Sequence, residues 1–346
     1  MSSAELLLAC ATLAPNLAFF SELGFRLAEI LPADDPSEAL LVGHGLRLRL
    51  VRGGDAPPAR LRLWVDDASD AGERVAPNGT RVELRLAGPP WTLPAAEPAF
   101  ERSAQASWQE GRAGMRYRDL VPSRQGGRLI ASQIRIEEGG PVPDYVHYHE
   151  VRYQLILCLR GWVEVVYQDQ GPPFRLEPGD CVLQPPTIRH RVLSCSPGLE
   201  VLELGSPARH PTRVDHELEL PTGVVDPERR FGGQRFVRHR ASEASWEPWR
   251  HAGYEARDTG IAAATGGLLD VRVARPAGEP EPDPWTHPGE LRFLFVSAGE
   301  LTLQRSGEAD ALLRAGDAVV LPPGLEHALA RPSADLELIE ALVAGA

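Results

Sequence analysis

The sequence predicts a mainly β protein that contains two copies of one β-rich unit, preceded by a small α+β module. Glycine and proline are abundant, at 33 and 32 of 346 residues, and aromatic residues make up only 6%, which favours short strands joined by turns. Two long segments of the chain resemble each other, whereas the first ninety residues follow a different pattern. The length is sufficient for two or three domains with buried cores.

The predicted amino-terminal module covers residues 1–90. The stretch "ELLLACATL" is typical of a strand, and "APNLAFFSELGF" is typical of a short helix with Pro15 near its first turn and Gly24 at its end. Three strand-like stretches follow, which are "FRLAEILP", "EALLVGHGLRLRLV" and "ARLRLWVDD". The expected order is therefore β-α-β-β-β.

An internal repeat organises the rest of the chain. The segment "HEVRYQLILCLRGWVEVVY" from His149 aligns with "HPGELRFLFVSAGELTLQR" from His287, 138 residues later. The segment "LEPGDCVLQPPTIRH" aligns with "LRAGDAVVLPPGLEH", and their final histidines, His190 and His327, are 137 residues apart. A nearly constant offset predicts two β units, at residues 100–208 and 236–346, joined by a polar, proline-bearing connector at 209–235.

Charge and cysteine content exclude several classes of function. The net charge is -12 and no Lys/Arg-rich run is present, so we expect no nucleic-acid partner. No apolar run reaches the roughly 18 residues of a membrane span, and no secretory leader is evident, so we expect a cytoplasmic protein. The four cysteines form no CxxC pair and are expected to be reduced thiols packed on strands.

Three histidines of the first unit are candidate metal ligands. His147 and His149 are two residues apart, so on a strand both side chains point to one face, and His190 comes from a later strand. Converging imidazoles suit Fe, Mn, Ni, Cu or Zn, and the sequence does not choose among these metals. Gln154 follows on the next predicted strand, and an amide there leaves the site more positive than a carboxylate would and cannot abstract a proton.

These motifs resemble those of the cupins, which are double-stranded β-helix barrels. The first cupin motif is matched by His147, His149, Gln154 at the position of the usual acid, and Gly161. The second motif is matched by Gly179, Pro185 and His190, whereas Thr187 replaces its middle glycine. The resemblance implies a bicupin in which the first barrel binds metal.

The second unit departs from this pattern. Trp285 and Arg292 replace two ligand positions, while His287 and His327 remain. A guanidinium beside two imidazoles repels a cation, so we expect the second barrel to be degenerate and structural.

The cupin resemblance implies a metal-dependent enzyme. We expect a non-haem Fe(II) dioxygenase-type oxidoreductase that uses O2 on a small anionic, chelating aromatic or enolic substrate. The alternatives are a non-redox cyclase, isomerase or lyase with Zn or Ni, and a small-molecule-binding protein without catalysis. Many cupins pair through barrel edges, so the resemblance also implies a homodimer.

Two further expectations concern the pocket and the amino-terminal module. Gln133, Arg135 and Tyr153 are pocket candidates, although strand pattern alone leaves open whether they face the pocket, the surface or a packed core. The stretches "NLAFFSELGFRL" and "GHGLRLRLV" resemble one module of the glyoxalase, or vicinal oxygen chelate, superfamily. Because no His/Glu ligand set is evident there, we expect docking or dimerisation from this module.

Overall fold

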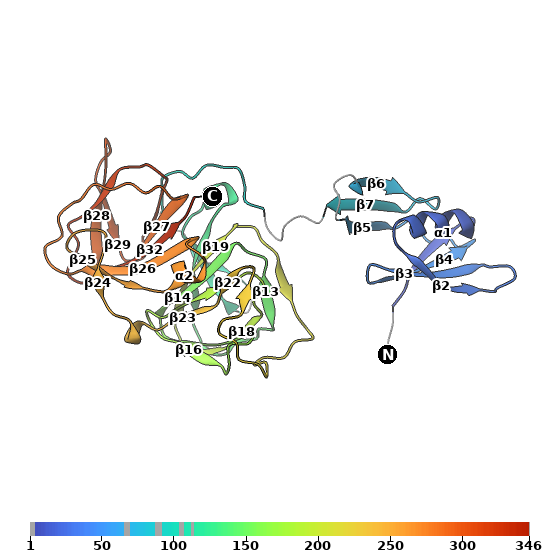
Figure 1. The fold of residues 1–346 in the computed structure, drawn as a ribbon, viewed down its shortest axis with the longest axis horizontal. Helices are drawn as coiled ribbons and strands as arrows, with labels where there is room; N and C mark the ends of the chain where they lie inside the picture. Colours follow the sequence, from blue (N-terminus) through green and yellow to red (C-terminus); the bar gives the residue numbers. More distant parts are fainter. Residues whose placement is uncertain (1–3, 66–69, 87–91, 104–106, 112–113, 346) are drawn as a thin grey trace. The chain divides into compact units, whose positions relative to one another are not determined.

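The computed structural model describes residues 4–65, 70–86, 92–103, 107–111 and 114–345. The chain divides into two compact units, residues 1–89 and residues 90–346 (Figure 1). The fold is mainly β, as the sequence predicts, and the second unit contains two barrels.

The first unit begins with a four-stranded sheet covered by one helix. Its strand order is β1-β4-β3-β2, with β1 parallel to β4 and the other pairs antiparallel. The elements are β1 (Leu6–Cys10), α1 (Leu13–Glu22), β2 (Arg26–Leu31), β3 (Glu38–Gly43) and β4 (Leu46–Arg52). Gly24, two residues after the end of the helix, has a φ of +86°, which lets the Phe25 amide donate to the Phe20 carbonyl at 3.0 Å.

The predicted β-α-β-β-β order holds for this sheet, but two of the predicted strands differ from the observed ones. The stretch "EALLVGHGLRLRLV" is a hairpin of two strands, β3 and β4, because His44 and Gly45 both adopt left-handed backbone angles (φ +50° and +71°). The strand predicted in "ARLRLWVDD" lies in a separate sheet of order β5-β7-β6, and Asp66 and Asp67 lie outside the described residues. This sheet contains β5 (Arg60–Val65), β6 (Gly72–Val75) and β7 (Arg81–Leu86). The resemblance to glyoxalases remains a prediction.

The first barrel is formed by two antiparallel sheets. One has the order β23-β17-β14-β19-β11-β10-β9 and the other β16-β15-β18-β13-β20, with β12 paired to β18. The strands are β9 (Gln109–Glu110), β10 (Arg116–Asp119), β11 (Ile130–Ile136), β12 (Gly140–Pro141), β13 (His147–His149), β14 (Tyr153–Arg160), β15 (Val163–Tyr167), β16 (Phe174–Leu176), β17 (Cys181–Gln184), β18 (His190–Cys195), β19 (Leu199–Ser206), β20 (Thr212–Val214) and β23 (Val237–His239). A two-stranded hairpin, β21 (Arg230–Phe231) and β22 (Gln234–Arg235), follows β20.

The second barrel repeats this arrangement. Its sheets have the orders β24-β25-β26-β32-β27-β30-β8 and β29-β28-β31. The elements are β8 (Glu101–Arg102), β24 (Glu247–Pro248), β25 (Tyr254–Asp258), α2 (Ile261–Ala264), β26 (Leu269–Pro276), β27 (Leu291–Ala298), β28 (Glu300–Arg305), β29 (Ala311–Arg314), β30 (Ala318–Leu321), β31 (His327–Ala330) and β32 (Glu337–Val343).

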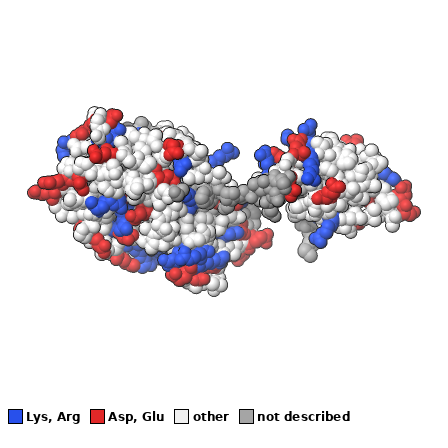
Figure 2. Space-filling view, turned by 45° about the horizontal axis from the view of Figure 1, so that its top comes forward, with Lys and Arg blue, Asp and Glu red and all other residues white. Residues whose placement is uncertain are grey.

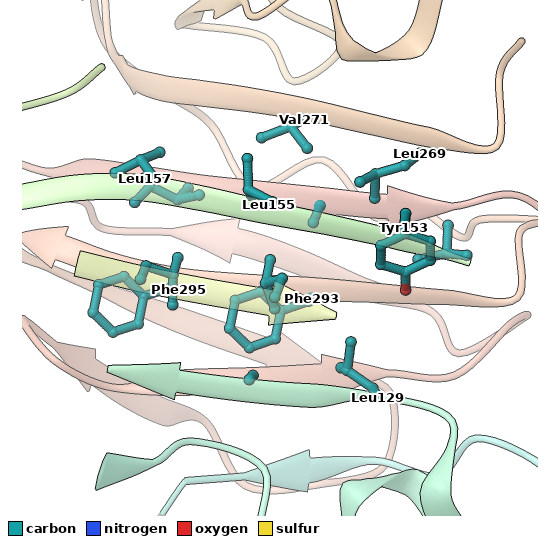
Figure 3. Packing of buried hydrophobic residues seen from close by; sticks show 14 of the residues in the cluster. Leu129, Tyr153, Leu155, Leu157, Leu269, Val271, Phe293 and Phe295 are labelled. Carbon is teal, nitrogen blue, oxygen red and sulfur yellow. The ribbon is translucent and has the colours of Figure 1, made fainter. Parts of the chain in front are cut away.

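The two barrels share one hydrophobic core. Leu155 and Leu157 of β14 pack in the same cluster as Val271, Phe293 and Phe295 of the second barrel (Figure 3). All five side chains are at most 1% exposed. Because side chains alternate along a strand, the odd-numbered residues of β14 face this shared core and the even-numbered ones face the barrel interior.

Two strands cross the predicted boundaries between the units. The strand β8, from the segment assigned to the first barrel, pairs with β30 of the second. The strand β23, from the segment assigned to the second barrel, pairs with β17 of the first. Within the predicted connector, β20 pairs with β13, which carries two candidate metal ligands.

Several simpler expectations can be compared with the fold. The four cysteines are buried and unpaired, as the sequence predicts. None of the described helices has the length and apolar character needed to cross a membrane. Acidic and basic side chains are interspersed over the face drawn in Figure 2.

Candidate metal centre

Three histidines from two neighbouring strands converge inside the first barrel. His147 pairs directly with His190 across β13 and β18, and His149 lies two residues further along β13. One ring nitrogen of each histidine lies within 4.8 Å of those of the other two. The rings of His147 and His190 are closest, with centroids 4.3 Å apart. Among the described residues, this is the one group of histidine, cysteine and acidic side chains arranged to hold a metal.

Hydrogen bonds fix the orientation of these rings. The Nδ1 atoms of His147 and His190 lie 2.8 and 3.0 Å from the carbonyl oxygens of Tyr145 and Ile188. A carbonyl only accepts, so in each neutral ring the proton is on Nδ1 and the lone pair is on Nε2, the nitrogen that a metal binds. The Nδ1 atom of His149 lies 2.9 Å from the Thr212 hydroxyl, so β20 orients this ring.

Thr187 holds the loop before His190 in an unfavourable backbone conformation. It occupies the glycine position of the second motif and has a φ of +68°, which is costly for a β-branched residue. Its amide donates to the His149 carbonyl at 2.9 Å, and its own carbonyl accepts from Arg189 Nη1 at 3.1 Å. The first bond ties the His190 loop to the strand that carries the other two histidines, and the second stabilises the loop itself.

A cavity of about 460 Å³ opens beside the histidines. Its walls are mainly apolar. Two amide side chains also line it, Gln154 and Gln184, which are direct cross-strand neighbours on β14 and β17. The apolar lining residues are Met115, Ile130, Ile134, Ile136, Ile156, Val163, Val165, Leu176, Val192, Leu199, Val201 and Ala208. This size and character suit an organic ligand with an apolar body.

The structure places the predicted site residues in different environments. Gln154, only 2% exposed, lines the cavity. Gln133 and Arg135 do not, because the neighbouring isoleucines of β11 face the cavity and these two point outward, where both donate to Glu200. Tyr153 lies in the core between the barrels, where burial raises the pKa of its hydroxyl. The sequence left these strand faces open, and none of the candidates Gln133, Arg135 and Tyr153 lines the cavity.

Several polar residues of the cavity were not predicted from the sequence. Glu203 of β19 lines it and accepts a hydrogen bond from Gln154 Nε2 at 2.6 Å. His210 lies with its ring centroid 5.5 Å from that of His149, and Arg209 and Arg124 contribute two exposed cations to the lining. Glu203 could have been found from the internal repeat, because it aligns with Glu340 of the second unit. The segment "ARH", which contains Arg209 and His210, matches no motif.

Comparison with known protein families identifies the barrels. A family model described as Cupin domain matches residues 133–202 and 271–341, which lie in the first and second barrel respectively. The chain thus has a bicupin arrangement, with one match to the cupin domain in each barrel. A search of curated proteins finds no match.

Solved structures agree with this fold. The bicupin is similar to oxalate decarboxylase from Bacillus subtilis, with a TM-score of 0.52 and 14% identity over 72% of this chain and 77% of that one. It is also similar to the protein Ylba from E. coli, with a TM-score of 0.53 and 11% identity over 73% of this chain and 93% of that one. At such identities the likeness concerns the fold alone.

In the second cupin, Arg292 occupies the centre of the barrel. Its side chain is fully buried, and its Nε donates to Glu340 at 2.6 Å. Its two terminal nitrogens hydrogen-bond to Nε2 of His327 and of His251. His287 directs its own Nε2 to the Leu321 carbonyl at 3.0 Å. The nitrogens that correspond to metal ligands in the first cupin are therefore engaged by a guanidinium or by the backbone.

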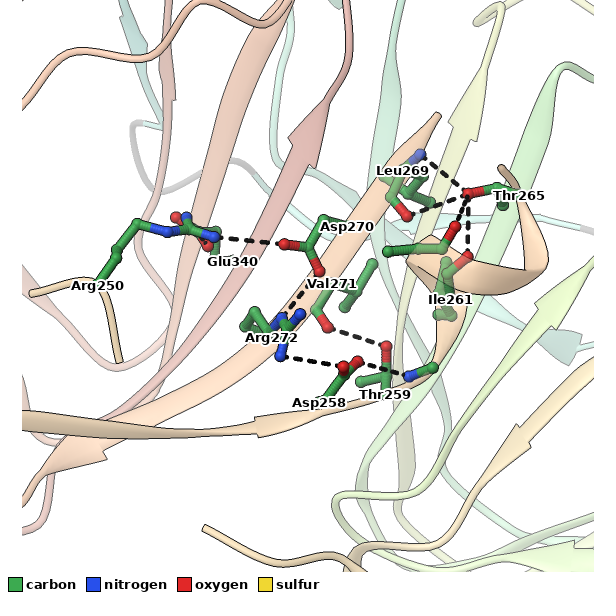
Figure 4. Close-up of polar contacts among 12 residues, drawn as sticks. Arg250, Asp258, Thr259, Ile261, Thr265, Leu269, Asp270, Val271, Arg272 and Glu340 are labelled. Carbon is green, nitrogen blue, oxygen red and sulfur yellow. Dashed lines mark hydrogen bonds and ion pairs between the residues drawn. The ribbon is translucent and has the colours of Figure 1, made fainter. Parts of the chain in front are cut away.

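Charge in this second centre is balanced by Glu340. The carboxylate also pairs with Arg250, whose other terminal nitrogen lies 3.3 Å from Asp270 (Figure 4). Burial, followed by the nearby Arg292, lowers the pKa of His251 to about 3 and that of His327 to about 4. Both imidazoles are thus neutral acceptors for the arginine at neutral pH.

Proposed function

We propose that the first cupin binds one divalent transition metal through His147, His149 and His190, with the Gln154 amide oxygen as a further ligand. The observation that carries this proposal is the convergence of three imidazoles beside an apolar cavity. Gln154 Oε1 supports the fit, because it is buried and has no hydrogen-bond partner among the described residues. A buried, unpaired carbonyl oxygen is costly, and a cation would satisfy it.

Among the divalent metals that suit imidazole donors, we propose iron, with Mn, Ni, Zn and Cu as alternatives. All four proposed donors are neutral, so the bound ion would keep its full positive charge and favour an anionic ligand. When bound, such a metal supplies a Lewis acid and, in the case of Fe(II), an electron donor for O2. We therefore propose a non-haem Fe(II) dioxygenase-type oxidoreductase.

The residues of the chain define the substrate class. The apolar walls exclude water and bury the body of an aromatic or enolic molecule, while Arg209 and Arg124 place positive charge at the cavity. Arg124 and the next residue, Gln125, both have a φ of +49°, a conformation that a ligand-binding loop often holds at a cost in stability. The proposed substrate is thus a small anion that chelates the metal and carries an apolar body.

A non-redox cyclase, isomerase or lyase is the second candidate. Glu203 favours it, because a carboxylate that lines the cavity gives a substrate hydroxyl a hydrogen-bond acceptor without any need for O2. Zinc or nickel would serve such a reaction.

Elemental analysis and oxygen uptake test these proposals together. The protein is purified without added metal, analysed, and then loaded with Fe(II) under anaerobic conditions. We expect about one metal per chain and O2 uptake with hydroxy-aromatic acids or enolates. Turnover that persists without O2 supports the second candidate. A protein that takes up no metal contradicts both, and tight substrate binding by that protein favours a binding protein.

A further inference from the structure

The contact between Gln154 and Glu203 fixes the direction of the glutamine amide. The donor is Gln154 Nε2, at 2.6 Å from Glu203 Oε1. The opposite orientation would put the amide oxygen against a carboxylate oxygen, so the assignment of oxygen and nitrogen is settled by charge. Gln154 Oε1 consequently points away from Glu203, into buried space.

The second cupin contains the same contact at the same strand positions. Glu203 lies opposite Ile156, two residues from Gln154, and Glu340 lies opposite Leu294, two residues from Arg292. The acid position of the first motif holds Gln154 in the first cupin and Arg292 in the second. In each cupin a side-chain nitrogen of this residue donates to the glutamate at 2.6 Å. The glutamate of the last strand is therefore a shared part of the scaffold, and its partner differs between the barrels.

We infer that Glu203 is a positioning residue that converts Gln154 into a metal ligand. This inference rests on the metal site proposed above. A charge-assisted bond to the amide nitrogen holds the side chain in one orientation and draws electron density onto Oε1, the atom proposed above as a metal ligand. The carboxylate also restores, one residue further out, the negative charge that glutamine does not bring to the site.

The charge at the proposed centre thus has a defined location. In a cupin with an acid at position 154, the negative charge would contact the metal directly. Here it is held behind a neutral ligand, so it offsets the metal charge through the amide and leaves the coordinating atoms neutral. Glu203 lines the cavity itself, so a substrate that occupies the cavity also meets this carboxylate.

Metal affinity tests the inference without reference to catalysis. We would measure binding of Zn2+ by chelator competition, and the visible absorption of the Co2+ form, in wild type and in Glu203→Gln. The substitution is expected to weaken Zn2+ binding about 10-fold to 100-fold and to change the Co2+ spectrum, as removal of an outer partner of a ligand does.

A charge swap separates positioning from general damage to the fold. Gln154→Glu combined with Glu203→Gln returns the carboxylate to the acid position, and is expected to restore affinity to within about threefold of wild type. The matched control is Glu200→Gln on the same strand, because Glu200 pairs with Arg135 outside the cavity; its Zn2+ affinity should equal that of wild type.

The outcomes distinguish this inference from the proposed function. Unchanged Zn2+ affinity and an unchanged Co2+ spectrum in Glu203→Gln would overturn the inference while the metal site stands. A loss that the swap does not restore would also overturn it. A wild-type protein that binds neither ion would overturn the metal site and the inference together, whereas failure to consume O2 would affect only the reaction proposed.

Discussion

At corresponding positions, the first cupin carries Gln154 and the second carries Arg292, and the two barrel interiors differ accordingly. In the first, three imidazole nitrogens converge beside a cavity of about 460 Å³. In the second, the guanidinium itself binds His327, His251 and Glu340. One scaffold therefore supports either a candidate metal site or a buried ion pair, depending on which side chain enters from the same strand.

The first prediction tests whether metal binding belongs to one barrel. His149→Ala removes one of the three imidazoles and should reduce the metal content from about one ion per chain to near zero, because two imidazoles and a neutral amide oxygen hold a divalent ion weakly. The matched control, His287→Ala in the second barrel, should keep the wild-type content. Elemental analysis after dialysis measures both, and equal losses in the two variants would contradict the asymmetry.

The second prediction concerns the stability of the ion pair. Arg292→Met leaves Glu340 buried with Arg250 as its remaining partner, and should lower the free energy of unfolding by about 3–5 kcal/mol. Urea denaturation measures the change. Arg314→Met, which breaks an exposed pair with Glu300, is the control and should cost less than about 1 kcal/mol. A loss below 1 kcal/mol for Arg292→Met would show that the pair is dispensable.

The third prediction is a pH dependence that arises in the second barrel. His251 and His327 keep pKa values of about 3 and 4 when folded, whereas an unfolded histidine titrates near 6.5. Between these values the unfolded chain binds more protons, so stability falls as the pH drops below 6.5. At pH 5 each histidine should cost about 2 kcal/mol relative to pH 7.5. Unfolding of His251→Gln across this range should show a shallower slope, and an identical slope would refute the assignment.

The fourth prediction concerns the face of strand β11. Arg135→Ala should change the kinetic constants of the metal-loaded enzyme less than about twofold, because Arg135 pairs with Glu200 outside the cavity. Arg209→Ala should raise KM about tenfold for an anionic substrate, since a hydrogen bond to a charged group is worth about 1.5–3 kcal/mol. Equal effects of the two variants would place Arg135 in the site after all.

Periodicity and repetition in the sequence explain why most of the architecture could be predicted. The constant offset between His149 and His287 identifies two equivalent units, and the spacing of His147 and His149 puts both rings on one face of a strand. These signals depend on the spacing of residues along the chain, which can be read directly from the sequence.

The missed residues depend on long-range packing. Which face of β11 or β14 meets the cavity is decided by the shared core between the barrels, where Leu155 packs in one cluster with Phe293. No local pattern in "IASQIRI" reports that contact, so the sequence left open which face of the strand Gln133 and Arg135 occupy. Glu203 is found by its contact with Gln154, 49 residues earlier in the chain.

The exchange of β8 and β23 between the barrels has a consequence for biosynthesis. During translation, the first barrel cannot add β23 to its sheet until residue 239 has left the ribosome. The segment Glu101–Arg102 emerges much earlier, yet its pairing partner β30 is completed only at Leu321. Neither barrel therefore closes its sheets on the ribosome before part of the other has been made, and separate expression of residues 100–208 would yield a barrel with an uncovered strand edge.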